Sequence, residues 1–462
     1  MNRVDIFYSR LAVFNSGFII YFSLFLRFSG FFAGGKQEES FIETSQTTGA
    51  QNPFENWKRK TVLFFGSQAI TFFGSALVSF SIIWYITLTT ESGVMTTLIL
   101  LCSFVPQLLI SFFSGVWADK YNRKTLIILA DGGIAIATLA LVIYMLAGYE
   151  SIPALLFIAM VRSVGMGIQM PAMNALIPQI VPADKLVRVN GINGSLQSIV
   201  NLASPAVAGA IMIYGKIYNI MMIDVVTAII GISILLLIPI PKHKRAQELV
   251  QTSYLEDLKE GFKYSVNHSF LKPLLIISAF FTVLCVPASF LNVLMVTQVF
   301  GANYLYLTLN EMSFFIGMLL GGLVIGVWGG FKNRVKTMLT GLAAFGLFTL
   351  GFGLTQELWV YLILMAIVGL SMPFVSSPMM SMIQEKVEPG KQGRVFSLMQ
   401  IVFTGLMPLA VMFFGPMADI IPVQTMVVYC GALIIVMSVI VFFNKAFCRQ
   451  GVFETKTEEI PR

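Results

Sequence analysis

The chain has 462 residues, of which 56% are hydrophobic and only 11% are charged, and its formal net charge is +7. Soluble proteins carry about a quarter of their residues as charged side chains, so this composition excludes a soluble globular protein and indicates a membrane protein. An excess of cations is typical of the cytoplasmic loops of membrane proteins. We therefore attribute the positive net charge to such loops, and we predict no nucleic-acid partner.

The first apolar stretch, from Leu11 to Gly35, carries one charge, Arg27, and leads into a polar run that ends near Asn52. It fits a signal-like segment, a thirteenth membrane span, or sequence that is not retained in the working protein. An arginine in mid-span would cost about 3 kcal/mol. We therefore expect residues 1–55 to form a peripheral or removable extension.

Apolar runs long enough to cross a bilayer recur along the rest of the chain. Lipid offers no hydrogen bonds to the backbone, so such runs form helices, and their continuous hydrophobicity excludes a β-barrel. We predict an all-α membrane fold of twelve helices, at 61–85, 95–117, 125–147, 153–180, 189–214, 218–240, 274–299, 307–328, 336–354, 358–383, 394–418 and 424–443.

Lysine and arginine gather on alternate connections between these runs, as in "WKRK" (57–60), "DKYNRK" (119–124) and "KHKR" (242–245). The intervening loops, such as "TTESG" (89–93), are short and nearly free of cations. Cation-rich loops stay in the cytoplasm, so both ends of the twelve-helix core are predicted to be cytoplasmic.

The longest polar connection, residues 241–272, divides the core into bundles at 56–240 and 273–445, and 446–462 form a cytoplasmic tail. Within this connection Leu255, Leu258, Phe262 and Val266 recur at helical spacing. They favour an amphipathic helix on the membrane surface, although a solvated linker fits equally well.

One short pattern occurs once in each predicted bundle: "GVWADKYNRKT" (115–125) and "GVWGGFKNRVKT" (326–337). Both copies lie between the second and third helix of their bundle. A second match, within the fifth helix of each bundle, pairs Gln197 with Gln400 and Pro205 with Pro408. The chain therefore looks like two six-helix units of the same topology, the parallel repeat of some secondary transporters.

The first copy resembles the signature loop of the major facilitator superfamily, Gly-x-Leu-Ala-Asp-Arg-x-Gly-Arg-Lys. The matching residues are Gly115, Ala118, Asp119, Arg123 and Lys124. The departures are Trp117, Lys120 and Asn122. The resemblance implies a conformational latch, in which Asp119 reaches the start of the eleventh helix near Gly393-Arg394 when the transporter faces outward. Arg123 and Lys124 would anchor the loop at the lipid surface.

Two further elements narrow the resemblance. Ser204-Pro205-Ala206-Val207-Ala208-Gly209 in the fifth helix resembles the Gly-Pro-x-x-Gly-Gly element of drug:proton exporters, and Arg162 with Gly165 resembles their Arg-x-x-x-Gly element. The overall pattern from Asn56 to Asn444 is most similar to the bacterial macrolide efflux permeases of this superfamily. That resemblance implies a multi-pass protein of the bacterial cytoplasmic membrane that exports amphipathic drugs.

Charges within membrane spans are costly and point to function. The sequence lacks a Gly-x-x-x-x-Gly-Lys-[Ser/Thr] phosphate loop, so transport is expected to use an ion gradient, although an ATPase partner stays open. The candidates for proton coupling are Arg162, Asp131, Asp224 and Glu311. Arg162 is the leading one, because a buried guanidinium can act as a state-dependent counter-charge, and the alternative is a static structural tie.

The polar residues expected to face a central cavity are Gln68, Gln169, Asn174, Asn292, Ser376 and Ser377. We predict a monomeric, non-enzymatic secondary transporter without metal or cofactor. Its partners would be an amphipathic small molecule, protons and membrane lipid, and it would work by alternating access. An importer, a lipid or metabolite translocator, and a membrane sensor that transports nothing are the alternatives.

Overall fold

The computed structural model describes residues 56–239 and 262–452, and in these ranges the chain is built from helices with a single isolated β-bridge between Asn333 and Val452. Twelve helical spans in this part are long and apolar enough to cross a membrane, as predicted. The extension 1–55 and most of the connection 241–272 lie outside the described residues; within the connection, 262–267 are helical.

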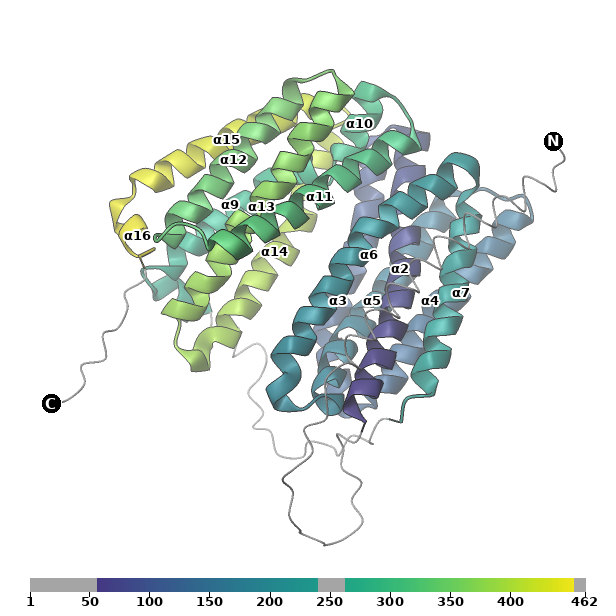
Figure 1. The fold of residues 1–462 in the computed structure, drawn as a ribbon. Coiled ribbons are helices and arrows are strands. Elements are labelled where there is room, and N and C mark those ends of the chain that lie inside the picture. The colour runs from purple at the N-terminus through teal and green to yellow at the C-terminus, as the bar shows by residue number, and fades with distance from the viewer. Residues whose placement is uncertain (1–55, 240–261, 453–462) are drawn as a thin grey trace, which may run out of the picture.

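The first six spans form one bundle, drawn in purple to teal in Figure 1. They are α2 (Trp57–Thr90), α3 (Gly93–Lys120), α4 (Arg123–Leu146), α5 (Ile152–Ile180), α6 (Leu186–Tyr214) and α7 (Ile217–Leu236).

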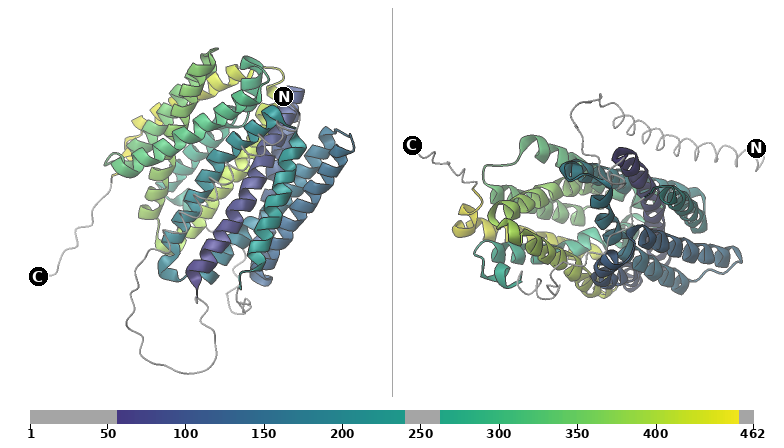
Figure 2. Two further views of the ribbon diagram at one scale, coloured as in Figure 1. Left: turned by 45° about the vertical axis from the view of Figure 1, so that its right-hand side comes forward. Right: turned by 90° about the horizontal axis from the view of Figure 1, so that it is seen from below.

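The remaining spans form a second bundle beside it. Its helices are α9 (Leu271–Ser289), α10 (Asn292–Phe300), α11 (Tyr304–Trp328), α12 (Arg334–Leu354), α13 (Leu358–Lys386), α14 (Pro389–Met417) and α15 (Val423–Phe443), followed by the short α16 (Lys445–Arg449). Seen from below, the two bundles lie side by side (Figure 2).

The seventh span is not the single helix expected at 274–299. It is divided into α9 and α10 at Phe290 and Leu291. Pro287, inside the last turn of α9, has no N–H to donate to the helix ladder, which weakens the helix just before the break.

The repeated Asn-Arg pair has the same local role in both bundles. The Asn122 side chain accepts hydrogen bonds from the first N–H groups of α4, and the Asn333 side chain accepts one at the start of α12. Asparagine is a favourable N-cap because its side-chain oxygen satisfies donors that have no partner within the helix. The repetition thus marks the beginning of the third helix in each bundle.

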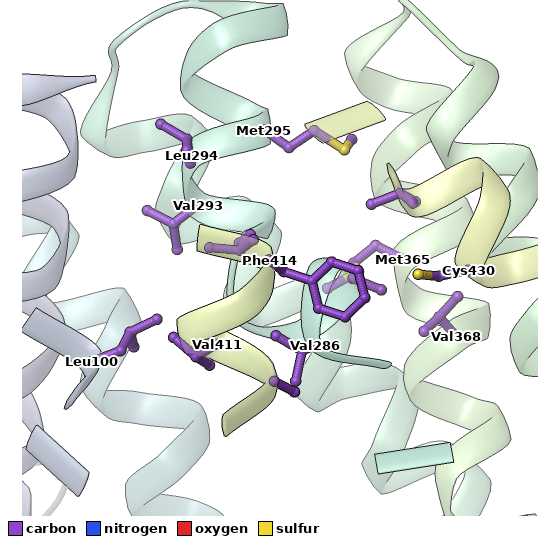
Figure 3. Close-up of a cluster of buried hydrophobic side chains, with 14 of the residues drawn as sticks. Leu100, Val286, Val293, Leu294, Met295, Met365, Val368, Val411, Phe414 and Cys430 are labelled. Atoms are coloured by element: carbon purple, nitrogen blue, oxygen red, sulfur yellow. The ribbon is translucent and has the colours of Figure 1, made fainter. Parts of the chain in front are cut away.

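The bundles touch toward one end and diverge toward the other (Figure 1). We call the first the closed end; it carries the loop around Ser92 and the loop from Ala418 to Pro422. The other, the cation-rich end, carries the connections at 121–122 and 329–333. α3 packs on α14 and α6 packs on α11. Leu100 of α3 and Val411 of α14 belong to one buried apolar cluster that joins the bundles (Figure 3).

Candidate functional site

A cavity of about 360 Å³ lies on the inner face of the first bundle, among α2, α3, α5 and α6. Its wall combines aromatic and methionine side chains with neutral polar groups. The polar lining residues are Gln68, Ser75, Ser79, Ser103, Gln107, Ser163, Asn193, Gln197 and Asn201, together with Arg162. The apolar ones include Phe65, Phe72, Phe80, Phe104, Met166 and Met170. Such a mixture suits an amphipathic molecule of drug size.

Arg162 and Asp224 form a buried ion pair behind this wall. The guanidinium Nη1 of Arg162 donates to a carboxylate oxygen of Asp224, and the two side chains are 7% and 2% exposed. Nη1 also donates to Thr138 Oγ1 at 2.8 Å, and Nη2 donates to the carbonyl oxygen of Ser75 at 3.3 Å. Ser75 Oγ donates to the other oxygen of Asp224 at 3.3 Å. Four helices therefore meet at one guanidinium.

A second polar chain ends at Asp131 on α4. Gln169 Nε2 donates to Asp131 Oδ1 at 2.6 Å and lies 3.4 Å from Gln68 Oε1. All three side chains are buried, and Gln68 lines the cavity. Gly165, the glycine of the exporter-like element, lies against Ala130 and Ile134, where a side chain would not fit.

Glu311, the fourth coupling candidate, lies apart from these three. It is on α11 of the second bundle, where Asn310 Nδ2 donates to it at 3.4 Å. Asn310 is held by the Tyr361 hydroxyl, which donates to its side-chain oxygen at 2.6 Å. The structure thus brings together Arg162, Asp224 and Asp131 in the first bundle and leaves Glu311 in the second.

The signature loop is tied to its own bundle in this conformation. Arg123 Nη1 donates to the Ala175 carbonyl of α5 at 2.6 Å, and Arg123 Nε donates to the Ala118 carbonyl at 2.9 Å. Lys124 Nζ donates to the carbonyls of Leu236 and Ile238 at 3.0 and 2.8 Å. Protein carbonyls thus hold both cations in this conformation, and their contact with lipid stays a prediction. Gly115 is exposed, and the Asp119 side chain lies outside what the structure describes.

The exporter-like element of α6 lies at the contact between the bundles. Gly209 is buried against Thr308 of α11, and a Cβ atom at this position would collide with the Thr308 hydroxyl. Ser204 and Pro205 are buried one turn earlier, and the Ser204 hydroxyl has no hydrogen-bond partner among the described residues. The small residue therefore lets α6 and α11 approach closely.

The cavity candidates from the sequence divide into three groups. Gln68 lines the cavity, and Gln169 is buried behind it. Asn292 is 2% exposed, at the start of α10. Asn174, Ser376 and Ser377 are exposed and do not line this cavity.

Several lining residues were not anticipated. Asn193, Gln197 and Asn201 follow one another on α6 at intervals of four residues. That spacing places polar groups on one face of a helix, and it is the sequence signal that would have identified them.

Ser163, next to Arg162, joins α5 to α3. Its hydroxyl donates to the Ser103 carbonyl at 2.7 Å and accepts from the Gln107 N–H at 2.9 Å. In an uninterrupted helix those two backbone groups bond to each other. The hydroxyl therefore sits within the α3 ladder beside Pro106 and links the position of α3 to that of α5.

Asp419 forms a contact between the bundles that the sequence did not indicate. The residue follows α14, and its carboxylate accepts from the Gly93 N–H and, at 3.0 Å, from the Val94 N–H at the start of α3. The Ser92 hydroxyl donates to it at 3.2 Å. A carboxylate at a helix N-terminus is favourable, because it satisfies unpaired N–H groups and faces the positive end of the helix dipole.

Comparisons with known proteins agree with this architecture. The sequence profile of the Major Facilitator Superfamily matches residues 64–408 and 288–449. Macrolide efflux protein A of Streptococcus pyogenes is 29% identical over 391 residues, which cover 84% of this chain and 96% of the relative. The protein of the same name from Enterococcus faecalis is 30% identical over 313 residues, covering 67% and 96%.

Among solved structures, a bacterial homolog of the human lysosomal transporter Spinster, in an inward-facing and unoccupied conformation, has the same fold. Its TM-score is 0.59 at 14% identity, and the match covers 87% of this chain and 98% of that chain.

Proposed function

Since the chain belongs to the Major Facilitator Superfamily, we propose that it is a proton-coupled exporter of amphipathic drugs such as macrolides. The observation that carries the proposal is the position of Arg162, which lines the cavity and at the same time pairs with the buried Asp224. A substrate in the cavity therefore contacts the one guanidinium that neutralises a carboxylate in the bundle core. The cycle moves the substrate and makes no covalent bond.

Drug export also agrees with the relatives, which carry the name macrolide efflux protein A. The cavity wall suits such molecules, because aromatic and methionine side chains adapt to different apolar shapes while neutral amides accept or donate hydrogen bonds. Macrolides are large amphipathic molecules, so we expect the facing surface of the second bundle to complete the site.

Alternating access requires the contacts at the closed end to break when the cation-rich end closes. The cation-rich end is the cytoplasmic one by the positive-inside rule, so the described conformation is the inward-facing one in the proposed cycle. In it Asp419 caps α3 from the other bundle, and Gly209 packs on Thr308. Both contacts lie far along the helices from the signature loop at the cytoplasmic end.

The test is efflux by the full chain in a bacterial host that lacks its own drug pumps. Expression should raise tolerance to a macrolide, and a protonophore should abolish efflux of the radiolabelled drug. Asp184→Asn, which removes an exposed surface charge, is the control and should behave like the unaltered chain. Efflux that continues after the proton gradient has collapsed would refute proton coupling, and unchanged tolerance to macrolides would refute this substrate class.

A further inference from the structure

The first bundle buries two carboxylates but only one cation among its described residues. Asp224 is fully compensated, because it receives Arg162 on one oxygen and the Ser75 hydroxyl on the other. The remaining described contacts of the Arg162 guanidinium go to Thr138 and to the Ser75 carbonyl. Asp224 is therefore suited to act as a fixed partner of the arginine.

Asp131 is buried without a cation. It is 5% exposed, its Oδ1 accepts from Gln169, and its Oδ2 has no hydrogen-bond partner among the described residues. The helices packed closely on α4 are α5 and α7, and the charged groups they bring into the bundle interior are Arg162 and Asp224, already paired with each other. An unpaired carboxylate in such a place is costly, whereas the neutral acid is tolerated.

Asp131 is nevertheless connected to the cavity. Gln169 lies between the Asp131 carboxyl group and Gln68, and Gln68 belongs to the cavity wall. Gln169 and Arg162 are on the same helix, α5, so a movement of α5 changes both the ion pair and the link between Asp131 and the cavity. Two amide side chains thus connect the buried acid to the cavity wall.

We propose that Asp131 is the proton-carrying residue of this transporter and that Asp224 is the fixed counter-charge of Arg162. In the inward-facing conformation the O–H bond of the Asp131 acid breaks, its electron pair stays on the carboxylate, and the proton passes to water in the cavity. After the change of access the carboxylate takes up a proton from the opposite side. The inference rests on the proton coupling proposed above and assigns the residue that performs it.

The experiment uses the full chain in proteoliposomes with a radiolabelled macrolide. Two rates are measured: transport driven by an imposed pH gradient, and exchange of internal for external drug without a gradient. In Asp131→Asn the gradient-driven rate should fall to the rate without a gradient, because an amide cannot carry a proton. Exchange should persist at a measurable rate, because Asn resembles the neutral acid in size and shape.

Two matched variants complete the design. Asp131→Glu should retain gradient-driven transport, because the carboxyl group is kept. The pH profile of its transport should be displaced, because the position of the carboxyl group changes. Asp184→Asn should keep gradient-driven transport, because that carboxylate is exposed at the surface and lies outside the buried polar groups. If Asp131→Asn inserts poorly, the Asp131→Glu variant is tested in its place, and proton release on drug binding is measured in detergent as a function of pH. A pH profile of proton release identical to that of the unaltered chain overturns the proposal.

The failure of this assignment differs from the failure of the proposed function. If the unaltered chain shows no transport driven by a pH gradient, proton coupling itself is wrong. If the unaltered chain shows it and Asp131→Asn shows it equally, coupling stands and Asp131 is not the carrier.

Discussion

The two bundles share a topology but differ in what they bury. Arg162 on α5 and Asp224 on α7 form an ion pair inside the first bundle. The corresponding positions in the second bundle, counted from the first residue of each helix, are Val368 on α13 for Arg162 and Cys430 on α15 for Asp224. Their exposed fractions are 1% and 3%. Figure 3 shows these two side chains beside Met365.

One residue that contacts the ion pair has an identical counterpart at the corresponding position of the second bundle. Thr138, which bonds to Arg162, has its counterpart in Thr349, the same number of residues after the start of α12. Thr349 is fully buried, and its hydroxyl has no partner among the described residues. The buried ion pair is therefore a feature of the first bundle, and the corresponding positions of the second bundle hold apolar side chains.

The largest expected effect comes from removing the arginine. Arg162→Ala leaves the Asp224 charge buried without a cation beside it, which should destabilise the protein by about 3–5 kcal/mol and abolish gradient-driven efflux. Val368→Ala, at the corresponding place, removes only methyl groups and should cost less. Thermal unfolding in detergent and efflux in proteoliposomes measure the two quantities.

The double variant Arg162→Ala with Asp224→Asn separates charge from packing. It should be more stable than Arg162→Ala alone, because no buried charge is then left unpaired. Arg162→Lys should not restore full activity, since an ammonium group cannot reach Asp224, Thr138 and Ser75 in the geometry of the planar guanidinium. A double variant as unstable as the single one would show that Arg162 acts through packing.

Much of the fold was readable from the sequence, because a bilayer fixes the length and hydropathy of each span. The twelve spans and the capping asparagines Asn122 and Asn333 are consequences of such local rules. The division between α9 and α10 was missed, since Phe290 and Leu291 are as apolar as their neighbours and hydropathy does not register a backbone break.

The site was readable only in part. Arg162 stands out as a cation in an apolar run, but its partner is 62 residues away, and pairing at that range depends on how helices pack. Asp419 gave no signal, because an aspartate in a short loop resembles any solvated loop residue until α3 of the other bundle is placed against it.

A smaller effect should distinguish the two threonines. Thr138→Val removes an acceptor from a buried guanidinium and should destabilise the protein by about 1.5–3 kcal/mol. Thr349→Val replaces a hydroxyl that has no described partner, so it should leave stability unchanged or raise it slightly. Unfolding temperatures measured side by side test this, and equal losses in both would contradict the asymmetry between the bundles.

The smallest expected effect concerns Asp419, a carboxylate of the second bundle that lies at the contact between the two bundles. Asp419→Asn removes the charge that faces the N-terminus of α3 and should weaken the closed end by about 1 kcal/mol, about a fivefold change in the ratio of the two conformations. Spin labels on Thr89 and Gln356, exposed positions in different bundles near this end, report the ratio as a distance distribution.

Glu357→Gln is the matched control, because Glu357 is exposed in the second bundle near the closed end and makes no described bond to the first bundle. It should leave the distance distribution unchanged. Asp419→Asn should increase the population of molecules with the longer distance between the labels. This increase should be smaller in high salt, because salt already screens the exposed Asp419 contact in the unaltered chain. If Asp419→Asn and Glu357→Gln give the same distribution, the Asp419 carboxylate does not hold the bundles together, and the closed end depends on packing such as that of Gly209 against Thr308.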